Sequence, residues 1–211
     1  IWQQAIETGW LAILASEASG GLGLGLTELC LVTEELGKGL VPEPISAVAA
    51  TAAVIGIRAG EVIRGTSIVL PALMEGPRAI GDERPSMTAE PNGDTITLDG
   101  LKTGVPVPGD VEQFLVSAVA PEGVVLALVD ADDVDITCTA TIDGTSTGSI
   151  GLKRSVGFRV AGPNESGTQI AKLLDAIHLS NAAELLGVME AAQDITLEYL
   201  KTREQFDRPI G

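Results

Sequence analysis

The longest regular pattern of apolar residues lies near the end of the chain, between Glu165 and Gly211. Between its opening Glu165-Ser166-Gly167 and Pro209, the stretch contains one glycine, Gly187, and no proline. Its apolar residues recur in steps of three and four, which is the spacing of one face of a helix: Ile170, Leu173, Leu174, Ile177, Leu185, Leu186, Val188, Met189, Ile195 and Leu200. We therefore expect a single helix of about 38 residues, roughly 57 Å long, that Pro209 ends. A helix of this length needs partner helices from elsewhere along most of its course.

Three shorter helices are predicted in the first part of the chain. Ile1 to Leu14 has its apolar residues on one helical face. Thr27 is a candidate N-cap for a helix with apolar positions through Leu40, and Pro42 follows that helix. The alanine-rich run from Ile45 to Ile57 predicts a third helix. The chain starts in the middle of a helical pattern and without a Met, so we expect it to be part of a longer protein.

Two features of this helical part allow a functional or a structural interpretation. The run Gly20–Gly25 could cradle a phosphate, but no strand precedes it and the Lys-Ser/Thr pair of a P-loop is missing. We favour a turn with close backbone approach. Glu34 and Glu35 could act as an acid–base pair, but neighbouring residues point about 100° apart on a helix, so one solvated and one partly buried carboxylate is the better interpretation.

The periodicity changes from Ser67 onward. Short apolar or alternating runs predict strands, at Ser67–Leu73, Thr95–Asp99, Phe114–Ala118, Val124–Asp130, Asp135–Ile142 and Leu152–Val160. Asp99-Gly100 is typical of a turn, and Ala120–Gly123 of a hairpin connection. Because no helix separates these strands, we expect an antiparallel sheet or small barrel. The sequence thus predicts an α+β protein, with a helical domain at 1–66, a β domain at 67–162 and a long helix at 163–211.

Charge and composition exclude several classes of partner. The 13 basic and 29 acidic residues give a formal net charge of −16, which disfavours nucleic acid and anionic membrane surfaces. No run of 18 apolar residues is present to span a membrane. Cys30 and Cys138 are far apart and share no metal-ligand spacing with the single histidine, so we expect no metal site and two core cysteines in a reducing, cytoplasmic compartment.

Two sequence motifs carry a resemblance to a known family. The run Tyr199–Gly211 closely resembles the helix-ending signature of the acyl-CoA dehydrogenases, with Asp207 where that family usually has glycine. The segment Ser16–Gly37 is similar to the stretch of their helical domain that reads PEEYGGLG followed by EELG. The predicted order of helices, β domain and long helix also agrees with this family.

The resemblance implies an FAD-dependent enzyme that removes an α-proton and a β-hydride from a CoA thioester. By match, Arg203, Glu204, Gln205 and Phe206 would reach the FAD of a neighbouring subunit, and Arg203 would offer its guanidinium to the pyrophosphate. A structural alternative for Arg203 is a cap at the helix end. Glu75 is the one clear match to the flavin motif on the first strand of the β domain. The C-terminal helices would build a homo- or hetero-oligomer, a dimer or tetramer, and an electron-transfer flavoprotein or similar acceptor would reoxidise the flavin.

The substrate residues implied by the resemblance lie on the long helix. Asp175 and His178 match positions that contact the CoA ester or line the acyl pocket, although a lone His in a helix is more often a packed residue. Ile177 matches the position where some members carry their catalytic base, and it cannot accept a proton. The usual glutamate of the family would lie beyond Gly211, so we assign no catalytic residue within this chain.

The flavin site departs from the family pattern at two positions. Gly104 stands where the family has a Trp that covers the flavin, and Pro106 stands where it has a Thr that donates a hydrogen bond near the reactive nitrogen. Two hypotheses follow: an active FAD-dependent acyl-CoA dehydrogenase, or a catalytically silent subunit that completes the FAD site of an active homologue. A related flavin oxidase or monooxygenase is a third option.

Overall fold

The computed structural model describes residues 1–76 and 85–211 of the chain. Its helices lie in the first third of the chain and at its end: α1 (Trp2–Glu7), α2 (Leu26–Lys38), α3 (Ile45–Val54), α4 (Ala59–Ile63) and α5 (Pro163–Thr202). The strands lie between them: β1 (Val69–Ala72), β2 (Thr88–Asn92), β3 (Thr95–Pro106), β4 (Gln113–Ala120), β5 (Gly123–Asp130), β6 (Asp135–Ala140) and β7 (Ser146–Ala161). The α+β class is thereby confirmed.

The N-terminal helices differ from the sequence predictions at their ends. The predicted helix from Ile1 to Leu14 is wrong beyond Glu7, because Gly9 adopts a left-handed conformation with φ of 77° and a short 3₁₀ turn follows it. The N-cap of α2 is Gly25 rather than Thr27: the Gly25 N–H donates to the Glu28 carboxylate at 2.8 Å. The helix α3 ends at Val54, three residues earlier than predicted.

The glycine run after α1 is a turn, as predicted, and it brings two backbones close together. A Cβ atom at Gly21 would stand 2.1 Å from the carbonyl oxygen of Ala15. No side chain larger than a hydrogen atom fits there without displacing the backbone. This position therefore requires glycine for packing.

The strands close into a barrel with mixed strand directions. A ring of hydrogen-bonded neighbours runs through β4, β2, β3, β7 and β5 and returns to β4. The predicted hairpin at Ala120–Gly123 is confirmed by the antiparallel pairing of β4 and β5. Of the two predicted arrangements, an antiparallel sheet or a small barrel, the structure has the barrel. Most of its strand pairs are antiparallel, and β1 and β2 differ in pairing parallel to β4.

The strand β3 is longer than its apolar alternation indicated. It continues to Pro106 through Asp99 and Gly100, so the predicted turn there is wrong. Gly100 has a φ of 152°, and the register with β7 shifts between Leu98 and Asp99, as expected of a bulge that keeps the strand paired. The partner strand β7 has 16 residues, which lets it pair with β3 along one edge and with β6 and then β5 along the other.

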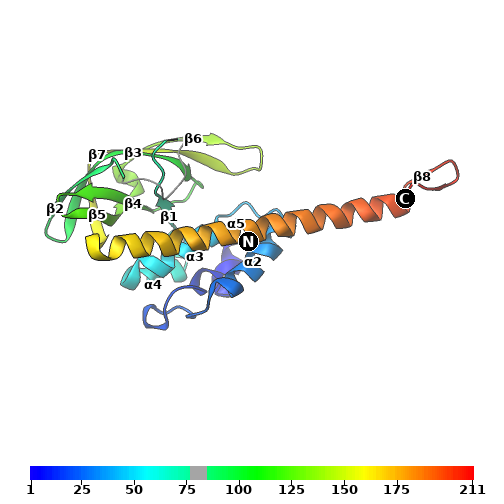
Figure 1. Ribbon diagram of the computed structural model, residues 1–211, viewed down its shortest axis with the longest axis horizontal. Coiled ribbons are helices and arrows are strands. Elements are labelled where there is room, and N and C mark those ends of the chain that lie inside the picture. The colour runs from blue at the N-terminus through cyan, green and yellow to red at the C-terminus, as the bar shows by residue number, and fades with distance from the viewer. Residues whose placement is uncertain (77–84) are drawn as a thin grey trace.

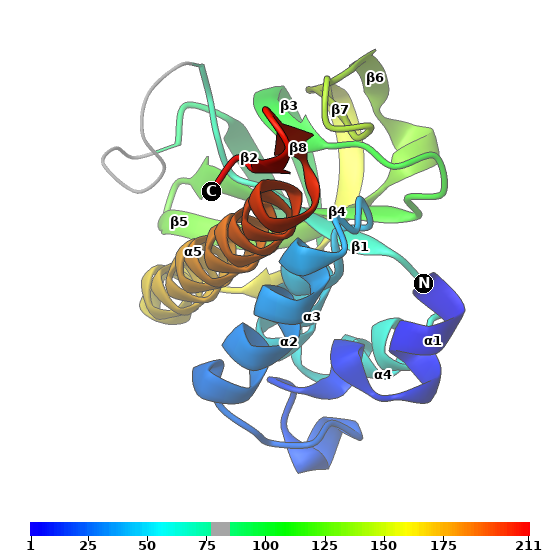
Figure 2. The same cartoon turned by 90° about the vertical axis from the view of Figure 1, so that its right-hand side faces the viewer.

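The long helix α5 packs against both the barrel and the N-terminal helices. Figure 1 shows the barrel on one side of α5, and Figure 2, turned by 90°, shows α5 beside α2 and α3 with the barrel above these helices. Helix α3 also contacts β1 of the barrel directly. The Ser166 hydroxyl donates to the Val124 carbonyl oxygen of β5 at 2.7 Å and fixes the first turn. At the α2 crossing, Lys38 pairs with Glu190 of α5 at 2.9 Å. The first half of α5 is thus part of the core.

The second half of α5 projects beyond the rest of the described chain (Figure 1). Its apolar side chains are largely exposed, as the predicted need for outside partner helices implies: Leu185, Leu186, Met189, Ile195, Leu197 and Tyr199. Pro209 does not end this helix, which stops at Thr202. A two-residue hairpin turn then joins β8 (Glu204–Gln205) to β9 (Arg208–Pro209).

Two further observations concern the sequence predictions. No helix among the described residues is long and apolar enough to cross a membrane. Cys30 is half-buried, but Cys138 is exposed on β6, so the prediction of two core cysteines is wrong for Cys138. Every residue of β6 is exposed, because this strand pairs with β7 outside the barrel core.

Candidate functional site

A cavity of about 610 Å³ lies where the three parts of the fold meet. The link between α2 and α3 forms one wall, and β1 with the following residues and the end of β3 form a second. The face of α5 and the turn between β6 and β7 complete it. Its volume lies within the range of sites that bind small molecules. It is therefore the principal candidate site in the described part of the chain.

Both positions that depart from the family's flavin pattern line this cavity. Gly104 has a φ of 62° and lies beside Met74, whose sulfur atom would stand 3.3 Å from a Cβ atom at this position. Pro106 ends β3 and has neither a hydroxyl nor a backbone N–H to donate. The neighbouring Thr103 hydroxyl already accepts a hydrogen bond from the Gly76 N–H at 2.8 Å.

One stripe of α5 faces the cavity. Leu174, Ile177, Asn181 and Glu184 are separated by three or four residues, which places them on one side of the helix. The first two side chains are apolar and the last two are polar. The cavity wall on α5 thus changes from apolar to hydrogen-bonding over about two helical turns.

Glu184 is the half-buried carboxylate of this stripe. Burial, together with the negative charge of Asp143, raises the pKa of Glu184 above its usual range. Asp143 belongs to the turn between β6 and β7, where hydrogen bonds from Thr141 and Thr145 lower its pKa to about 2. The negative charge of Asp143 therefore disfavours ionisation of Glu184 at the edge of the cavity.

Glu43 adds a second carboxylate to the lining, from the link between α2 and α3. Its Oε2 atom is buried and has no hydrogen-bond partner among the described residues. A buried carboxylate oxygen without a donor raises the free energy of the folded state. None of the described residues that line the cavity is Lys, Arg or His.

Glu75, the predicted flavin residue, is held by partners within the chain. The fully buried Lys102 donates to Glu75 Oε1 at 2.5 Å and to the Ser117 hydroxyl at 3.1 Å. The Ser86 N–H and hydroxyl both donate to Glu75 Oε2. Partial burial acts to raise the pKa of Glu75, but the hydrogen bonds from Lys102 and Ser86 outweigh it and hold that pKa below its usual range. Glu75 thus connects β3 to the residues just before β2.

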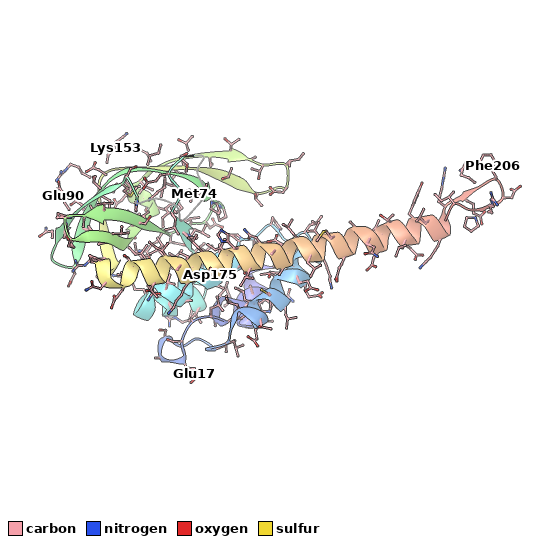
Figure 3. The ribbon with its side chains drawn as sticks, in the orientation of Figure 1. Glu17, Met74, Glu90, Lys153, Asp175 and Phe206 are labelled. Atoms are coloured by element: carbon pink, nitrogen blue, oxygen red, sulfur yellow. The ribbon has the colours of Figure 1, made fainter. Side chains whose placement is uncertain are left out.

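The two predicted substrate residues are exposed on α5. Asp175 and His178 do not line the cavity in the described chain, where Leu174 and Ile177 take the facing positions. Asp175 lies on the side of α5 near the N-terminal helices (Figure 3). A role for these two residues in binding CoA stays a prediction.

The four residues matched to the FAD-binding signature begin after α5 ends, with three of them in the terminal hairpin. The Arg203 N–H donates to the Tyr199 carbonyl oxygen at 2.8 Å, while its side chain is exposed. Phe206 is 94% exposed at the hairpin tip, far from Met74 and the barrel (Figure 3). Phe206 and Asp207 both have positive φ, of 55° and 60°, as a tight hairpin turn requires.

Sequence reasoning missed the two carboxylates of the cavity. Glu43 follows Pro42 in a link that carries no periodic pattern, so no local signal marked it. Glu184 follows Ile177 by seven residues, so the spacing already placed it on the same helical face. No group of three or more His, Cys, Asp or Glu residues in the described chain is arranged to hold an ion.

Comparison with known proteins agrees with this architecture. Residues 1–61 match the family described as acyl-CoA dehydrogenase, N-terminal domain. The whole chain is 33% identical to acyl-CoA dehydrogenase FadE27 of Mycobacterium tuberculosis and covers 58% of its length. Among solved structures, it matches the Tcur3481-Tcur3483 steroid ACAD with a TM-score of 0.85 and 33% identity, over the whole chain and 59% of that chain. It matches the ChsE4-ChsE5 complex from Mycobacterium tuberculosis with a TM-score of 0.84 and 30% identity, over 59% of that chain.

Proposed function

The chain belongs to the acyl-CoA dehydrogenase family, and from this premise we propose that it acts as a subunit of an oligomeric dehydrogenase of CoA thioesters. In this role it completes the FAD site of a neighbouring chain. The chain spans less than two thirds of the length of these relatives. Two of the similar structures are named as pairs of different proteins, which agrees with a heteromeric assembly.

The position of the terminal hairpin carries the proposal. α5 ends at Thr202, about 27 Å along the helix axis from Glu184 at the cavity. Arg203 and Phe206 therefore lie too far away to act in the cavity of their own chain. Their exposed guanidinium and ring are available to another chain, and the exposed apolar face of the second half of α5 gives that chain a surface to cover.

The chain's own cavity does not fit the flavin of FAD. Pro106 supplies no hydrogen-bond donor at the position matched to the flavin contact, and Gly104 supplies no covering ring. The described lining holds the carboxylates of Glu43 and Glu184 and no cationic side chain, so it offers no charge partner to the phosphates of the cofactor. We therefore assign no catalytic step to this cavity.

The chain's own residues have binding roles in this proposal. The Arg203 guanidinium pairs with the pyrophosphate of FAD in the neighbouring site, where its planar donors suit two phosphate oxygens. The Phe206 ring packs against the cofactor and excludes water, while Glu204 and Gln205 supply polar contacts beside it. FAD held there would supply the hydride acceptor for the acyl group, and an electron-transfer flavoprotein or similar acceptor would reoxidise it.

An active dehydrogenase with its own FAD is the second candidate. The observation that favours it is the name shared by relatives that align with the whole chain, which are acyl-CoA dehydrogenases. In that case the catalytic base comes from a part of the protein outside residues 1–211. Glu75 then serves the flavin site indirectly, because its two oxygens already bind Lys102 and Ser86.

Flavin content distinguishes the two candidates. The full-length protein is purified alone and after co-expression with a homologous chain, and its visible absorption is recorded. We expect flavin only in the mixed assembly, bleached there by an acyl-CoA. The Arg203→Ala variant should lower the flavin content of that assembly, whereas Arg64→Ala, an exposed arginine on the opposite part of the fold, should not. Stoichiometric flavin in the protein purified alone would contradict the first candidate and support the second.

A further inference from the structure

The strand β6 forms an edge of the sheet. Its six residues pair antiparallel with β7 on one side, and no described strand pairs with them on the other. All six residues are exposed, and β6 lies at the outer margin of the barrel (Figure 1). The strand therefore presents a row of backbone N–H and C=O groups that no described strand binds.

The direction of these groups follows from the contact between β6 and β7. A Cβ atom at Gly148 of β7 would stand 2.1 Å from the Thr137 carbonyl oxygen, so that oxygen points toward β7. The backbone groups of successive residues point to opposite sides of an antiparallel strand. The N–H and C=O of Cys138 therefore point outward, and those of Ile136 and Ala140 do so as well.

The sequence of β6 lacks devices that commonly protect an edge strand. It contains no proline, lysine or arginine, and its register with β7 is continuous from Asp135 to Ala140, without a bulge. Ile136, Thr137 and Thr139 are β-branched residues, which favour the extended conformation. The outer edge is thus open to another strand.

Hydrogen bonds hold β6 in place at both of its ends. Before the strand, the Ser155 hydroxyl donates to the Asp133 carbonyl oxygen at 2.7 Å. After it, the Asp143 carboxylate accepts from the Thr145 N–H and hydroxyl, and the Thr141 N–H donates to the Thr145 carbonyl oxygen at 2.9 Å. A partner strand therefore meets an edge that is already ordered, which lowers the entropy lost on binding.

Charge along this edge selects the partner. Asp132 and Asp133 precede β6, Asp143 follows it, and all three are exposed. Lys153 pairs with Asp135 at 2.7 Å and offsets the charge of that residue. An extended segment that carries Lys or Arg gains opposite-charge pairs with the remaining carboxylates.

A second copy of this chain fits the edge less well. In antiparallel pairing of two copies, Asp132 and Asp133 of one would face Asp143 of the other, and parallel pairing would bring Asp135 beside the same residue of its copy. Like charges opposite one another destabilise a strand pair. The net charge of −16 opposes self-association over longer distances as well.

We propose that the outer edge of β6 binds an extended segment of another protein, rich in Lys and Arg, as an added β-strand. Main-chain hydrogen bonds to Cys138 and its alternate neighbours hold the segment, and the flanking aspartates select its charge. The site uses neither the cavity nor the terminal hairpin, so it is independent of the flavin role.

Three peptides of the same length test this proposal: KVTVKVK, its acidic counterpart EVTVEVE, and KVPPKVK, which keeps the charge but loses N–H donors on both sides of the strand. Binding to the full-length protein is measured by isothermal titration calorimetry at neutral pH and low salt. We expect KVTVKVK to bind at least about tenfold more tightly than either of the others. Equal binding of KVPPKVK would overturn strand addition, and equal binding of EVTVEVE would overturn the basic character of the partner.

Hydrogen–deuterium exchange locates the bound peptide. KVTVKVK should slow amide exchange several-fold in residues 135–140. Exchange in β3, which already has a strand on each side, should stay unchanged. Unchanged exchange in residues 135–140 on saturation with the peptide would overturn the assignment to β6.

Substitutions at position 138 separate main-chain pairing from side-chain contact. Cys138→Pro removes the outward N–H, whereas Cys138→Val keeps it and serves as the matched control. We expect Cys138→Pro to weaken KVTVKVK binding at least about tenfold and Cys138→Val to leave it unchanged. Equal affinity of the two variants for the peptide would contradict main-chain pairing.

Charge variants make the test independent of how well the proline variant folds. Asp132→Asn with Asp133→Asn should weaken KVTVKVK binding several-fold. Asp194→Asn with Glu198→Gln, at two exposed carboxylates on α5, is the matched control and should leave binding unchanged. Equal effects of the two double variants would show that the peptide responds only to the net charge of the protein, and would overturn the selective role of these aspartates.

Discussion

Gly187 of α5 lies directly against the main chain of Glu34 in α2. A Cβ atom at position 187 would stand 1.9 Å from the Glu34 carbonyl oxygen. The contact is reciprocal, since a Cβ atom at Gly37 of α2 would stand 2.1 Å from the carbonyl oxygen of Glu184. The two helices therefore meet backbone to backbone, at the point where α5 also presents Glu184 to the cavity.

We expect Gly187→Ala to destabilise the protein. The new methyl group must push α2 and α5 apart, at a cost of roughly 1–3 kcal/mol, which exceeds the gain of about 1 kcal/mol from better helix propensity. Gly167→Ala is the matched control, because Gly167 is an exposed glycine in the same helix with no atom within 4 Å of its added Cβ. It should stabilise the protein. Urea denaturation checks both, and a similar change in the two variants would contradict the close contact.

We expect Glu75→Gln to lower the free energy of unfolding by roughly 2–5 kcal/mol at neutral pH. The substitution leaves the fully buried Lys102 ammonium without its charged partner. Replacing both residues, as Glu75→Gln with Lys102→Met, should recover part of the loss because no charge is then buried alone. Equal stability of the single and double variants in thermal or urea unfolding would show that the pair is not coupled.

The pair of Glu75 and Lys102 also predicts that the folded protein loses stability at acidic pH. The folded-state pKa of Glu75 lies below its usual value, so its contribution to stability is present above about pH 4.5 and is lost as pH falls through the folded-state value. The parent protein should therefore lose more stability than Glu75→Gln between neutral pH and about pH 3. Urea unfolding at a series of pH values measures the difference, and parallel curves would refute the assignment.

The raised pKa of Glu184 predicts the opposite dependence of folding stability on pH. Its folded-state pKa is raised, so the stability that it contributes is present below the pKa of the unfolded chain and is lost as pH rises through the folded-state value. Glu184→Gln should therefore be more stable than the parent at neutral pH and equal to it below about pH 4. Asp143→Asn should lower the pKa of Glu184, which NMR titration of the side-chain carboxyl carbon measures. An unchanged pKa would remove Asp143 as a cause.

The hairpin turn predicts an effect at Asp207. Both Phe206 and Asp207 hold positive φ, and a non-glycine residue in this conformation costs roughly 1–2 kcal/mol. Asp207→Gly should therefore stabilise the hairpin and slow amide exchange in residues 204–209 several-fold, as measured by hydrogen–deuterium exchange with mass spectrometry. Asp207→Ala is the control, and it should speed exchange because alanine lacks the local hydrogen bonding of aspartate.

Local patterns predicted the elements that they determine on their own. The apolar stripe of α5 and the pairing of β4 with β5 follow from spacing and from one turn, so the sequence was sufficient for both. Whether Gly9 and Gly100 interrupt their elements could not be predicted from local patterns. Gly9 ends a helix and Gly100 continues a strand, and the packing around each glycine decides between these two possibilities. The strand β2 escaped prediction because its Glu, Pro and Asn residues are poor strand formers, and its pairing with β3 and β4 overrides that preference.

The candidate site was less predictable than the fold. The flavin-motif positions Gly104 and Pro106 were found by resemblance, and the structure places both at the cavity. Glu43 and Glu184 are 141 positions apart in the sequence, so nothing local joined them. The end of α5 was also misjudged: Pro209 suggested a long helix, but the chain turns at Arg203 because β8 and β9 pair with each other instead.

Because α5 is held against α2 at Gly187, a small change in the angle between the two helices displaces the far end of α5. Lys38 of α2 still pairs with Glu190 one turn beyond this crossing, and from Gly187 the helix runs about 22 Å to Thr202. A tilt of about 5° at the crossing would move Arg203 and Phe206 by on the order of 2 Å, which is enough to make or break the hydrogen bond proposed between Arg203 and a cofactor in another chain. The absence of a single methyl group at Gly187 thus sets the position of the terminal hairpin, to which we assign the proposed contact.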